Sequence, residues 1–342
     1  MIFQLGRTTI SETIYPHKYY IYRHLYRKSI VMSLDLDARL LRYFVAVAEE
    51  LNFSRAAARL HVSQPPLSYA IKQLEEGLGA QLFIRSSRKV ALTPAGRALY
   101  REALFLLRVD ADLRVLIKRI DAGLQGQLKI GFVGSMLYRG LAEVLGQCKR
   151  HYPDVDHALF ELNSAEQIEL ISRGGLDIGF IHANPLPDGI ASATLVTEPF
   201  ALCVPAGHAL AGQAHVALSQ FAQDDFIFFS RSFSPVYYEN LLAMCADAGF
   251  TPTVKYEARH WLSVVSLVSQ NMGVSLVPAC LAYSGISGAR FLPFDHAKRS
   301  ITQLIWSPTA HSGVQENHIA LIRQAFAGPA GYTAQGIQAP LG

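Results

Sequence analysis

The sequence lacks any hydrophobic run long enough to cross a membrane as a helix. Although 50% of the 342 residues are hydrophobic, they never form an uninterrupted stretch of about 18 residues. Residues 1–32 also lack the apolar core of a secretory signal, because Tyr, Arg, Lys and His interrupt it. We therefore expect a cytoplasmic protein without a membrane partner.

Cysteine is scarce, and its spacing excludes two kinds of site. Separations of 55, 42 and 35 residues leave no Cys-x-x-Cys pair and no zinc-ligand spacing. We expect reduced, mostly buried thiols and predict no metal and no cofactor. A redox switch is the alternative, and nothing in the sequence supports it. The four residues are Cys148, Cys203, Cys245 and Cys280.

The short motifs of common enzyme classes are missing as well. No Gly-x-Ser-x-Gly elbow, Walker-type phosphate loop or cluster of metal ligands occurs. The stretch "YSGISG" around Ser287 comes closest to an elbow, but its spacing is wrong. We therefore predict that the protein is not an enzyme.

Acidic side chains are under-represented in the N-terminal part of the chain. Residues 1–32 carry five basic and one acidic side chain, and residues 33–120 carry 14 and nine. Residues 121–342 carry 12 basic and 17 acidic side chains, so the net charge changes from positive to −5. This asymmetry indicates a polyanion-binding N-terminal part joined to a different C-terminal part.

Both ends of the chain lack a clear hydrophobic period. Residues 1–33 are expected to be a poorly ordered extension, or to result from a wrongly assigned start of translation, in which case Met32 is the true first residue. A basic arm that adds nonspecific DNA affinity is the alternative. The Gly- and Ala-rich residues 328–342 are expected to form a flexible tail.

Residues 34–93 carry the pattern of three helices followed by a hairpin. Leu36–Leu51 has a broad apolar face. Ser54 is well placed to cap a short second helix that ends near Leu60. Two helices joined by a tight turn, with another helix before them, make a helix-turn-helix module.

The third helix belongs to the stretch "HVSQPPLSYAIKQLE". Ser63 can cap it through its hydroxyl, and Pro65 and Pro66 then fall in the first turn, where backbone N–H groups have no intrahelical partner. The predicted inward face carries Leu67, Ile71, Leu74 and Leu78. A polar stripe on another face carries Gln64, Ser68 and Lys72, with Tyr69 beside it. This stripe could approach a base edge without repelling phosphate; a solvated helix face is the alternative.

A two-stranded wing is predicted where "AQLFIR" and "KVALT" flank "SSR". Its tip would offer Arg85, Arg88 and Lys89 to phosphates or to a minor groove. A hairpin with solvated basic residues is the alternative. The candidate DNA contacts thus comprise the stripe and the wing. They also include Arg55 of the second helix, Ser63, Pro65 and Pro66.

Thr93-Pro94 repeats the helix-start signal and opens a long helix over residues 94–121. Apolar residues recur along it at spacings of three and four, which makes a seam of two heptads. We prefer a linker helix that dimerises over one that packs onto the module's own core. The seam residues are Leu106, Val109, Leu113, Leu116 and Ile120.

Residues 122–327 alternate predicted strands and helices, which indicates α/β architecture with a largely parallel sheet. Strands are predicted in "QLKIGFVG", "DIGFIHA", "FALCVP", "FIFFS", "VKYEA", "GVSLVP" and "ITQLIW". Helices are predicted over Gly140–Tyr152, Ala165–Arg173, Pro235–Ala248 and Trp261–Asn271. "SAEQ", from Ser164 to Gln167, reads as a capping box.

A change of phase after Pro199 predicts two lobes joined by two crossings. Lobe I would hold about residues 122–197 and 300–327, and lobe II about residues 198–299. A cleft at such a junction is a natural ligand site.

The stretch "FSRAAARLHVSQPPLSYAIKQLEEGLGAQLFIRSSRKVALTPAG" resembles the LysR-type transcriptional regulators at many positions. The resemblance continues more weakly in "LKIGF", "YPDV", "LDIGF" and "MGVSLVP". It implies a winged helix-turn-helix, a dimerising linker helix and a two-lobed, periplasmic-binding-protein-like effector domain. It further implies a homotetramer on double-stranded promoter DNA, a small-molecule effector between the lobes, and RNA polymerase as a candidate partner.

The same resemblance assigns the residues that line the effector cleft. Hydroxyls at two helix starts could bind a carboxylate, because free N–H groups and the helix dipole favour an anion there; plain N-capping is the alternative. His260-Trp261 is also a candidate, although Trp261 could equally be core. The assigned residues are Ser135, Ser164, His182, Phe229, Ser230 and Arg231.

A solute-binding protein with an incidental N-terminal module is the main rival interpretation. It would leave the basic helix-turn-helix unexplained.

Overall fold

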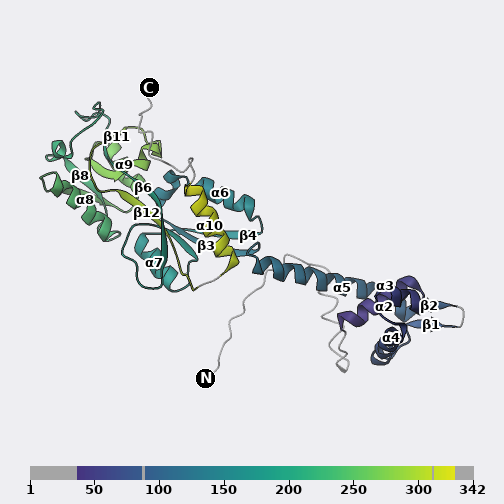
Figure 1. Cartoon of the computed structure of the whole chain (residues 1–342). Coiled ribbons are helices and arrows are strands. Elements are labelled where there is room, and N and C mark those ends of the chain that lie inside the picture. Colours follow the sequence, from purple (N-terminus) through teal and green to yellow (C-terminus); the bar gives the residue numbers. More distant parts are fainter. Residues whose placement is uncertain (1–36, 87–88, 310–311, 328–342) are drawn as a thin grey trace, which may run out of the picture. The chain divides into compact units, whose positions relative to one another are not determined.

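The structure is a computed structural model that describes residues 37–86, 89–309 and 312–327 (Figure 1). The extension over residues 1–33, Arg88 at the tip of the wing and the tail over residues 328–342 lie outside the described residues. The chain divides into two compact units, and the boundary falls between Arg114 and Val115. Each unit has a buried core of its own.

The first unit contains the three helices that the sequence predicts. They are α2 (Ala38–Glu50), α3 (Phe53–Arg59) and α4 (Gln64–Leu78). Their apolar faces meet in one core, in which Phe44, Ala56 and Leu67 are completely buried. Three packed helices bury enough apolar surface to stabilise a small module.

The caps of α3 and α4 differ from the prediction. Asn52, rather than Ser54, caps α3, and its Oδ1 accepts the Arg55 N–H at 3.0 Å. Ser63 does occupy the N-cap position of α4, but its side chain makes no capping hydrogen bond. The cause is the pair of prolines: a cap hydroxyl accepts from the second or third helical N–H, and Pro65 and Pro66 have none.

The inward face of α4 is confirmed for Leu67, Ile71 and Leu74, which are all buried. The prediction is wrong for Leu78, which is 36% exposed. Leu78 is the last residue of α4 and precedes Gly79, whose φ of 64° ends the helix. The helix therefore passes beyond the core before its final turn.

The wing and the start of the long helix are confirmed. Strands β1 (Phe83–Arg85) and β2 (Val90–Leu92) pair in antiparallel fashion. Helix α5 (Pro94–Asp121) begins as predicted, because Thr93 Oγ1 accepts the Gly96 N–H at 2.9 Å. Among its described residues, only Gly96 and Ala103 are buried.

The second unit contains a five-stranded sheet in the order β4-β3-β5-β12-β6, which we call lobe I. Helices α6 and α10 cover one face of this sheet and α7 covers the other. Residues of α6 and α10 belong to one apolar cluster, and residues of α7 belong to another. The strands are β3 (Gly126–Phe132), β4 (Val155–Glu161), β5 (Ile178–His182), β6 (Ala191–Glu198) and β12 (Ser300–Trp306). The helices are α6 (Leu141–His151), α7 (Ser164–Ser172), α10 (Gly313–Ala327) and the 3-10 helix η1 (Gly134–Arg139).

Lobe II follows β6 and returns to lobe I at β12. It is built around an antiparallel sheet in the order β10-β7-β11 and a parallel pair, β8-β9. Its strands are β7 (Phe200–Pro205), β8 (Asp225–Phe229), β9 (Thr253–Ala258), β10 (Ser275–Pro278) and β11 (Ala289–Pro293). Its helices are α8 (Pro235–Asp247), α9 (Trp261–Ser269), η2 (Leu218–Phe221) and η3 (Ala279–Ser284).

The expectation of a largely parallel sheet is wrong for this unit. Among the described strands of this unit, β3 pairs in parallel with β4 and β5, and β8 pairs in parallel with β9. In contrast, β12 runs antiparallel to β5 and β6, and β7 runs antiparallel to β10 and β11. The reason is the connectivity, because the chain leaves lobe I along β6 and returns along the adjacent β12. The sequence does not reveal this direction, since a buried strand has the same apolar pattern whether it is parallel or antiparallel to its neighbours. Strands β4, β6 and β11 were not predicted.

The two crossings between the lobes lie side by side. Glu198 ends β6 and Ser300 begins β12, and these residues are partners in the antiparallel register. The two chain segments that join the lobes are therefore neighbours where β6 ends and β12 begins.

The four cysteines are free and buried, as predicted. Burial raises the pKa of the Cys148 thiol to about 11 and that of the Cys245 thiol to about 12. Thiols of this kind are poor nucleophiles, so the structure gives no support to a redox switch.

No helix in the described part of the chain is both long and apolar enough to span a membrane.

Candidate functional site

The polar stripe of α4 faces away from the core of its own unit. The side chain of Lys72 is 70% exposed, and Nζ lies 3.5 Å from Glu76 Oε1. Gln64 is exposed and its Oε1 accepts a hydrogen bond from Ser54 Oγ at 2.9 Å, while Ser68 is half-buried. Tyr69, beside the stripe, is 64% exposed. The stripe is thus available to a partner outside the unit.

The start of α4 is also exposed. Ser63, Pro65 and Pro66 all lie at the surface. Arg55 of α3 is exposed as well, with its Nε 3.5 Å from Glu50 Oε2. An exposed ion pair of this kind is weak and can be exchanged for another anion.

The wing is tied to α4 by a carboxylate. Glu75 Oε1 accepts the N–H groups of Leu82 and Phe83, and its Oε2 lies 2.7 Å from Arg85 Nη2. The Arg85 guanidinium also lies over the ring of Phe53, 5.0 Å from its centroid. Arg85 therefore holds the wing in place, whereas Lys89 is exposed.

The second unit contains a cavity of about 450 Å³ between its two lobes. Three of the six predicted residues line it: Ser164, His182 and Phe229. His260 and Trp261 line it as well, and Trp261 also belongs to the buried core of lobe II, so both interpretations offered for Trp261 hold. The rest of the wall is largely aromatic and aliphatic, from Val133, Leu137, Tyr138, Phe233, Tyr237 and Leu262.

The other three predicted residues do not line this cavity. Ser135 is completely buried behind His182, and Ser230 is buried, with its Oγ 3.0 Å from Ser232 Oγ. Arg231 is exposed and pairs with Glu239 at 2.6 Å. The resemblance to the LysR-type regulators assigned these residues by their positions in the chain and could not show on which side the side chains point.

The predicted capping box at Ser164–Gln167 is shifted by one residue. Asn163 is the N-cap of α7, and Asn163 and Glu166 exchange the two reciprocal hydrogen bonds. Ser164 is thereby released from capping, and its Oγ accepts the His182 N–H at 3.2 Å. The Ser164 hydroxyl keeps its own hydrogen for another acceptor.

His182 lies at the centre of the site and is neutral near pH 7. Burial, and secondarily the positive charge of Arg139, lower its pKa to about 3. The ring lies against those of Tyr237 and Trp261, with centroid distances of 5.0 and 6.4 Å. Its Nδ1 is buried and has no hydrogen-bond partner among the described residues.

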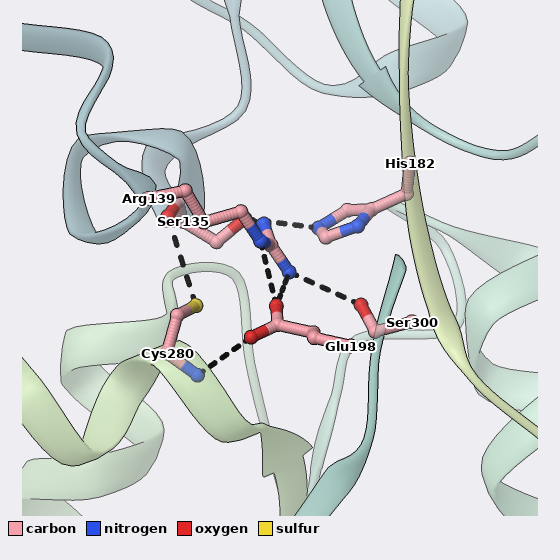
Figure 2. Close-up of polar contacts among 6 residues, drawn as sticks. All are labelled: Ser135, Arg139, His182, Glu198, Cys280 and Ser300. Carbon is pink, nitrogen blue, oxygen red and sulfur yellow. Dashed lines mark hydrogen bonds and ion pairs between the residues drawn. The ribbon is translucent and has the colours of Figure 1, made fainter. Parts of the chain in front are cut away.

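Behind His182 lies a buried polar network that the sequence did not predict (Figure 2). Arg139 Nε donates to Glu198 Oε1 at 2.6 Å, Nη1 donates to Ser135 Oγ at 2.7 Å, and Nη2 donates to Ser300 Oγ at 3.1 Å. Glu198 Oε2 accepts the Cys280 N–H at 2.9 Å. Arg139 and Glu198 are almost completely buried, as such charges are only when paired.

This network joins both crossings to both lobes. Arg139 comes from η1 of lobe I, Glu198 and Ser300 come from the two crossings, and Cys280 comes from lobe II. The only signal in the sequence was the change of phase next to Pro199.

The cavity wall carries charges of both signs. Arg259 supplies the positive charge, and Glu161 and Glu166 supply the negative charges. The Arg259 guanidinium stacks over Phe233, 4.9 Å from the ring centroid.

A winged helix-turn-helix with an exposed polar stripe, joined to a two-lobed domain with a central cavity, defines a class of DNA-binding regulators with a ligand-binding domain. Comparison with known proteins agrees. The family model described as "Bacterial regulatory helix-turn-helix protein, lysR family" matches residues 38–97. The model described as "LysR substrate binding domain" matches residues 121–327.

Individual relatives match this chain over most of its length. The chain is 36% identical over 275 residues to the uncharacterized HTH-type transcriptional regulator YnfL of Escherichia coli (strain K12), covering 80% of this chain and 93% of that one. It is 35% identical over 244 residues to the HTH-type transcriptional regulator AlsR of Bacillus subtilis (strain 168), covering 71% and 81%. The crystal structure of full-length CbnR with its target DNA shares the fold, with a TM-score of 0.75, 24% identity, and coverage of 85% and 100%.

The chain therefore belongs to the LysR family: it is a DNA-binding transcriptional regulator with an effector-binding domain, and not an enzyme.

Proposed function

We propose that α4 enters the major groove of promoter DNA and contacts it through Gln64, Ser68 and Lys72. The exposure of this stripe on the helix after the turn is the observation that carries the proposal. Amide and hydroxyl groups can read base edges, and an ammonium group can contact phosphate. Helix-turn-helix proteins dock in this way, with the N-terminal residues of the second helix at the bases.

Around this stripe, the other exposed residues would position the module on the duplex. We assign phosphate or groove contacts to the exposed Arg55 and Lys89, with Tyr69 and the exposed start of α4 beside them. From the sequence alone we assign the same role to Arg88, which lies outside the described residues. Arg85 contributes by orienting the wing, since its guanidinium is held by Glu75.

We further propose that α5 dimerises the protein and that dimers assemble into a homotetramer. Leu106, Val109, Leu113 and Ile120 are between 42% and 54% exposed, and they follow heptad spacing. An apolar seam of this kind is favourable to bury, and a second copy of the same helix matches its spacing.

The cavity is proposed to bind a small carboxylate as the effector. Its volume of about 450 Å³ lies within the range of small-molecule sites. The hydroxyl of Ser164, at the start of α7, and the ring of His182 supply polar groups for one end of the ligand. The aromatic wall from lobe II, including Trp261 and Phe229, would cover an apolar body.

Regulation would follow from a population shift. An effector that touches both lobes binds one interlobe arrangement better than another and so changes its population. In a dimer or tetramer, that change alters how the DNA-binding units engage their half-sites.

A thermal-shift measurement on the full chain tests the effector proposal. Small aliphatic and aromatic carboxylates are each compared with the amine of the same carbon skeleton. A carboxylate at about 100 times its Kd is expected to raise the midpoint by about 5–10 °C, because it binds only the folded state. Stabilisation by the amines alone, or by no member of the panel, would contradict the proposal.

A further inference from the structure

The ring of His182 has one nitrogen with a partner and one without. Nε2 lies 3.2 Å from Ser135 Oγ, and Nδ1 is buried without a hydrogen-bond partner among the residues that the structure describes. Ser135 does not line the cavity, whereas His182 does. Nε2 is thus directed at Ser135 (Figure 2), and Nδ1 is the ring nitrogen that has no protein partner among the described residues.

The hydrogen bonds of Ser135 determine which nitrogen carries the proton. A guanidinium has only donors, so Arg139 Nη1, at 2.7 Å, must donate to Ser135 Oγ. The hydroxyl hydrogen of Ser135 then needs an acceptor. In the described parts of the chain, His182 Nε2 is the only acceptor within its reach.

Ser135 O–H consequently donates to Nε2, and the proton of the neutral ring lies on Nδ1. The opposite tautomer would direct Nε2–H at Ser135 and leave the Ser135 hydrogen without an acceptor in a completely buried place. A doubly protonated ring would also direct Nε2–H at Ser135, and it would place a second buried positive charge next to Arg139. Burial and like-charge repulsion both disfavour that state.

The position of Arg139 is itself fixed by other groups. Glu198 Oε1 accepts from Arg139 Nε at 2.6 Å, and Ser300 Oγ accepts from Nη2 at 3.1 Å. Glu198 Oε2 accepts the Cys280 N–H at 2.9 Å, and no hydrogen bond joins Glu198 to Ser135 in the described part of the chain. These bonds hold the guanidinium so that Nη1 points at Ser135 Oγ.

We propose that Arg139 and Ser135 are positioning residues that hold His182 as the neutral Nδ1–H tautomer, so that the cavity presents a buried N–H donor to its ligand. The inference rests on the proposed role of the cavity as the effector site. It specifies the chemistry of the ligand: an atom that accepts a hydrogen bond, such as a carboxylate oxygen, meets Nδ1. The hydroxyl of Ser164, whose Oγ already accepts from the His182 backbone, adds a second donor beside it.

Nitrogen NMR can test the tautomer in the ligand-free full chain. The protein is labelled with ¹⁵N only at Nδ1 of histidine, and solid-state spectra are compared for the wild type and His182→Gln near pH 7.5. The difference isolates one of the 12 histidines. We expect the missing signal to have the shift of a protonated imidazole nitrogen in a neutral ring. An unprotonated Nδ1 would overturn the proposal, and His182→Asn provides the same assignment if the first variant does not fold.

Two further variants separate positioning from structure. Ser135→Ala removes the hydroxyl that donates to Nε2, so part of the His182 signal should move to the unprotonated range. Ser164→Ala is the matched control, because Ser164 touches the backbone N–H of His182 and not its ring. The His182 Nδ1 signal should not move in this variant. A signal that stays fully protonated in Ser135→Ala would refute the role assigned to Ser135 and Arg139.

The ligand requirement has its own readout. For any carboxylate that raises the unfolding midpoint, the amine of the same skeleton should bind at least tenfold more weakly, and His182→Phe should remove most of this difference. Equal binding of carboxylate and amine by the wild type would overturn the acceptor requirement. If no carboxylate binds, the proposed effector class fails, while the tautomer measured without ligand still decides the state of His182.

Discussion

The two functional regions of this regulator treat positive charge in opposite ways. On α4, the side chain of Lys72 is 70% exposed and only 3.5 Å from one equally exposed carboxylate. Between the lobes, the side chain of Arg139 is 1% exposed and is bonded to three side chains, of which Glu198 and Ser300 are distant along the chain. The exposed charge can exchange its partner for phosphate, whereas the buried charge is a fixed structural element that orients its neighbours.

The largest expected effect comes from breaking the buried network. Glu198→Gln leaves Arg139 buried with no counter-charge, so the effector-binding unit should lose about 3–5 kcal/mol of stability. Thermal or urea unfolding, followed by tryptophan fluorescence from Trp261 in this unit, measures the loss.

The exposed pair of Arg173 and Glu169, at 2.8 Å on α7, is the matched control for this change. Arg173→Ala should cost less than about 1 kcal/mol, because both side chains are more than half exposed. Comparable losses for the buried and the exposed pair would show that the buried Arg139–Glu198 pair is no more important for stability than a surface ion pair.

The next effect concerns pH and the His182 ring. Burial, followed by the charge of Arg139, lowers its pKa to about 3, against 6.5 for an ordinary histidine. Between these values the unfolded chain binds a proton that the folded chain does not, so stability falls as the pH falls below 6.5.

His182→Gln removes this proton. Between pH 6.5 and pH 5 the wild type should lose about 2 kcal/mol more than the variant, at about 1.4 kcal/mol per pH unit. Unfolding curves at both pH values give the comparison. Parallel pH profiles for the two proteins would show that His182 titrates normally in the folded state.

A smaller effect is expected at the seam of α5. Leu113 is 54% exposed, and Leu113→Glu would place a carboxylate in the proposed dimer interface. Dimer dissociation should become at least about tenfold easier, since burial of a leucine contributes about 1.5–3 kcal/mol. Sedimentation velocity over a range of concentrations measures it. Arg108→Glu, on an exposed position outside the seam, is the control and should leave the dimer intact.

The smallest effect comes from one exposed lysine. Lys72→Ala should weaken binding to all duplexes to a similar extent and reduce the slope of log K against log salt by about 0.9, the loss of one phosphate contact. Fluorescence anisotropy at several salt concentrations measures the slope. Lys255→Ala, in lobe II, should leave it unchanged; an unchanged slope for Lys72→Ala as well would exclude Lys72 from the interface.

The exposed region was predicted well from the sequence because its signals are local. The start of α4, the two strands of the wing and the Thr93 cap each depend on residues within a few positions of one another. The errors in the caps were small: the cap of α3 is Asn52, two residues before the predicted Ser54, and the cap of α7 is Asn163, one residue before the predicted Ser164.

The buried region could be predicted only in part. Ser164 and His182 were assigned to the cavity by the resemblance to the LysR-type regulators. Arg139 was not, because its partners Glu198 and Ser300 are 59 and 161 positions away along the chain. An arginine next to a turn usually reads as a surface residue, and only the tertiary structure shows that it is enclosed.

The central claim is that the polar stripe of α4 distinguishes one DNA sequence from another. Its most direct test is the ratio of affinities for a duplex that the wild-type chain selects from a random pool and for a scrambled duplex of the same composition, both in the same salt. Gln64→Ala combined with Ser68→Ala should reduce this ratio about tenfold or more while affinity for the scrambled duplex stays the same, and Gln127→Ala, exposed in lobe I, should not change it. An undiminished ratio in the double variant would contradict the claim.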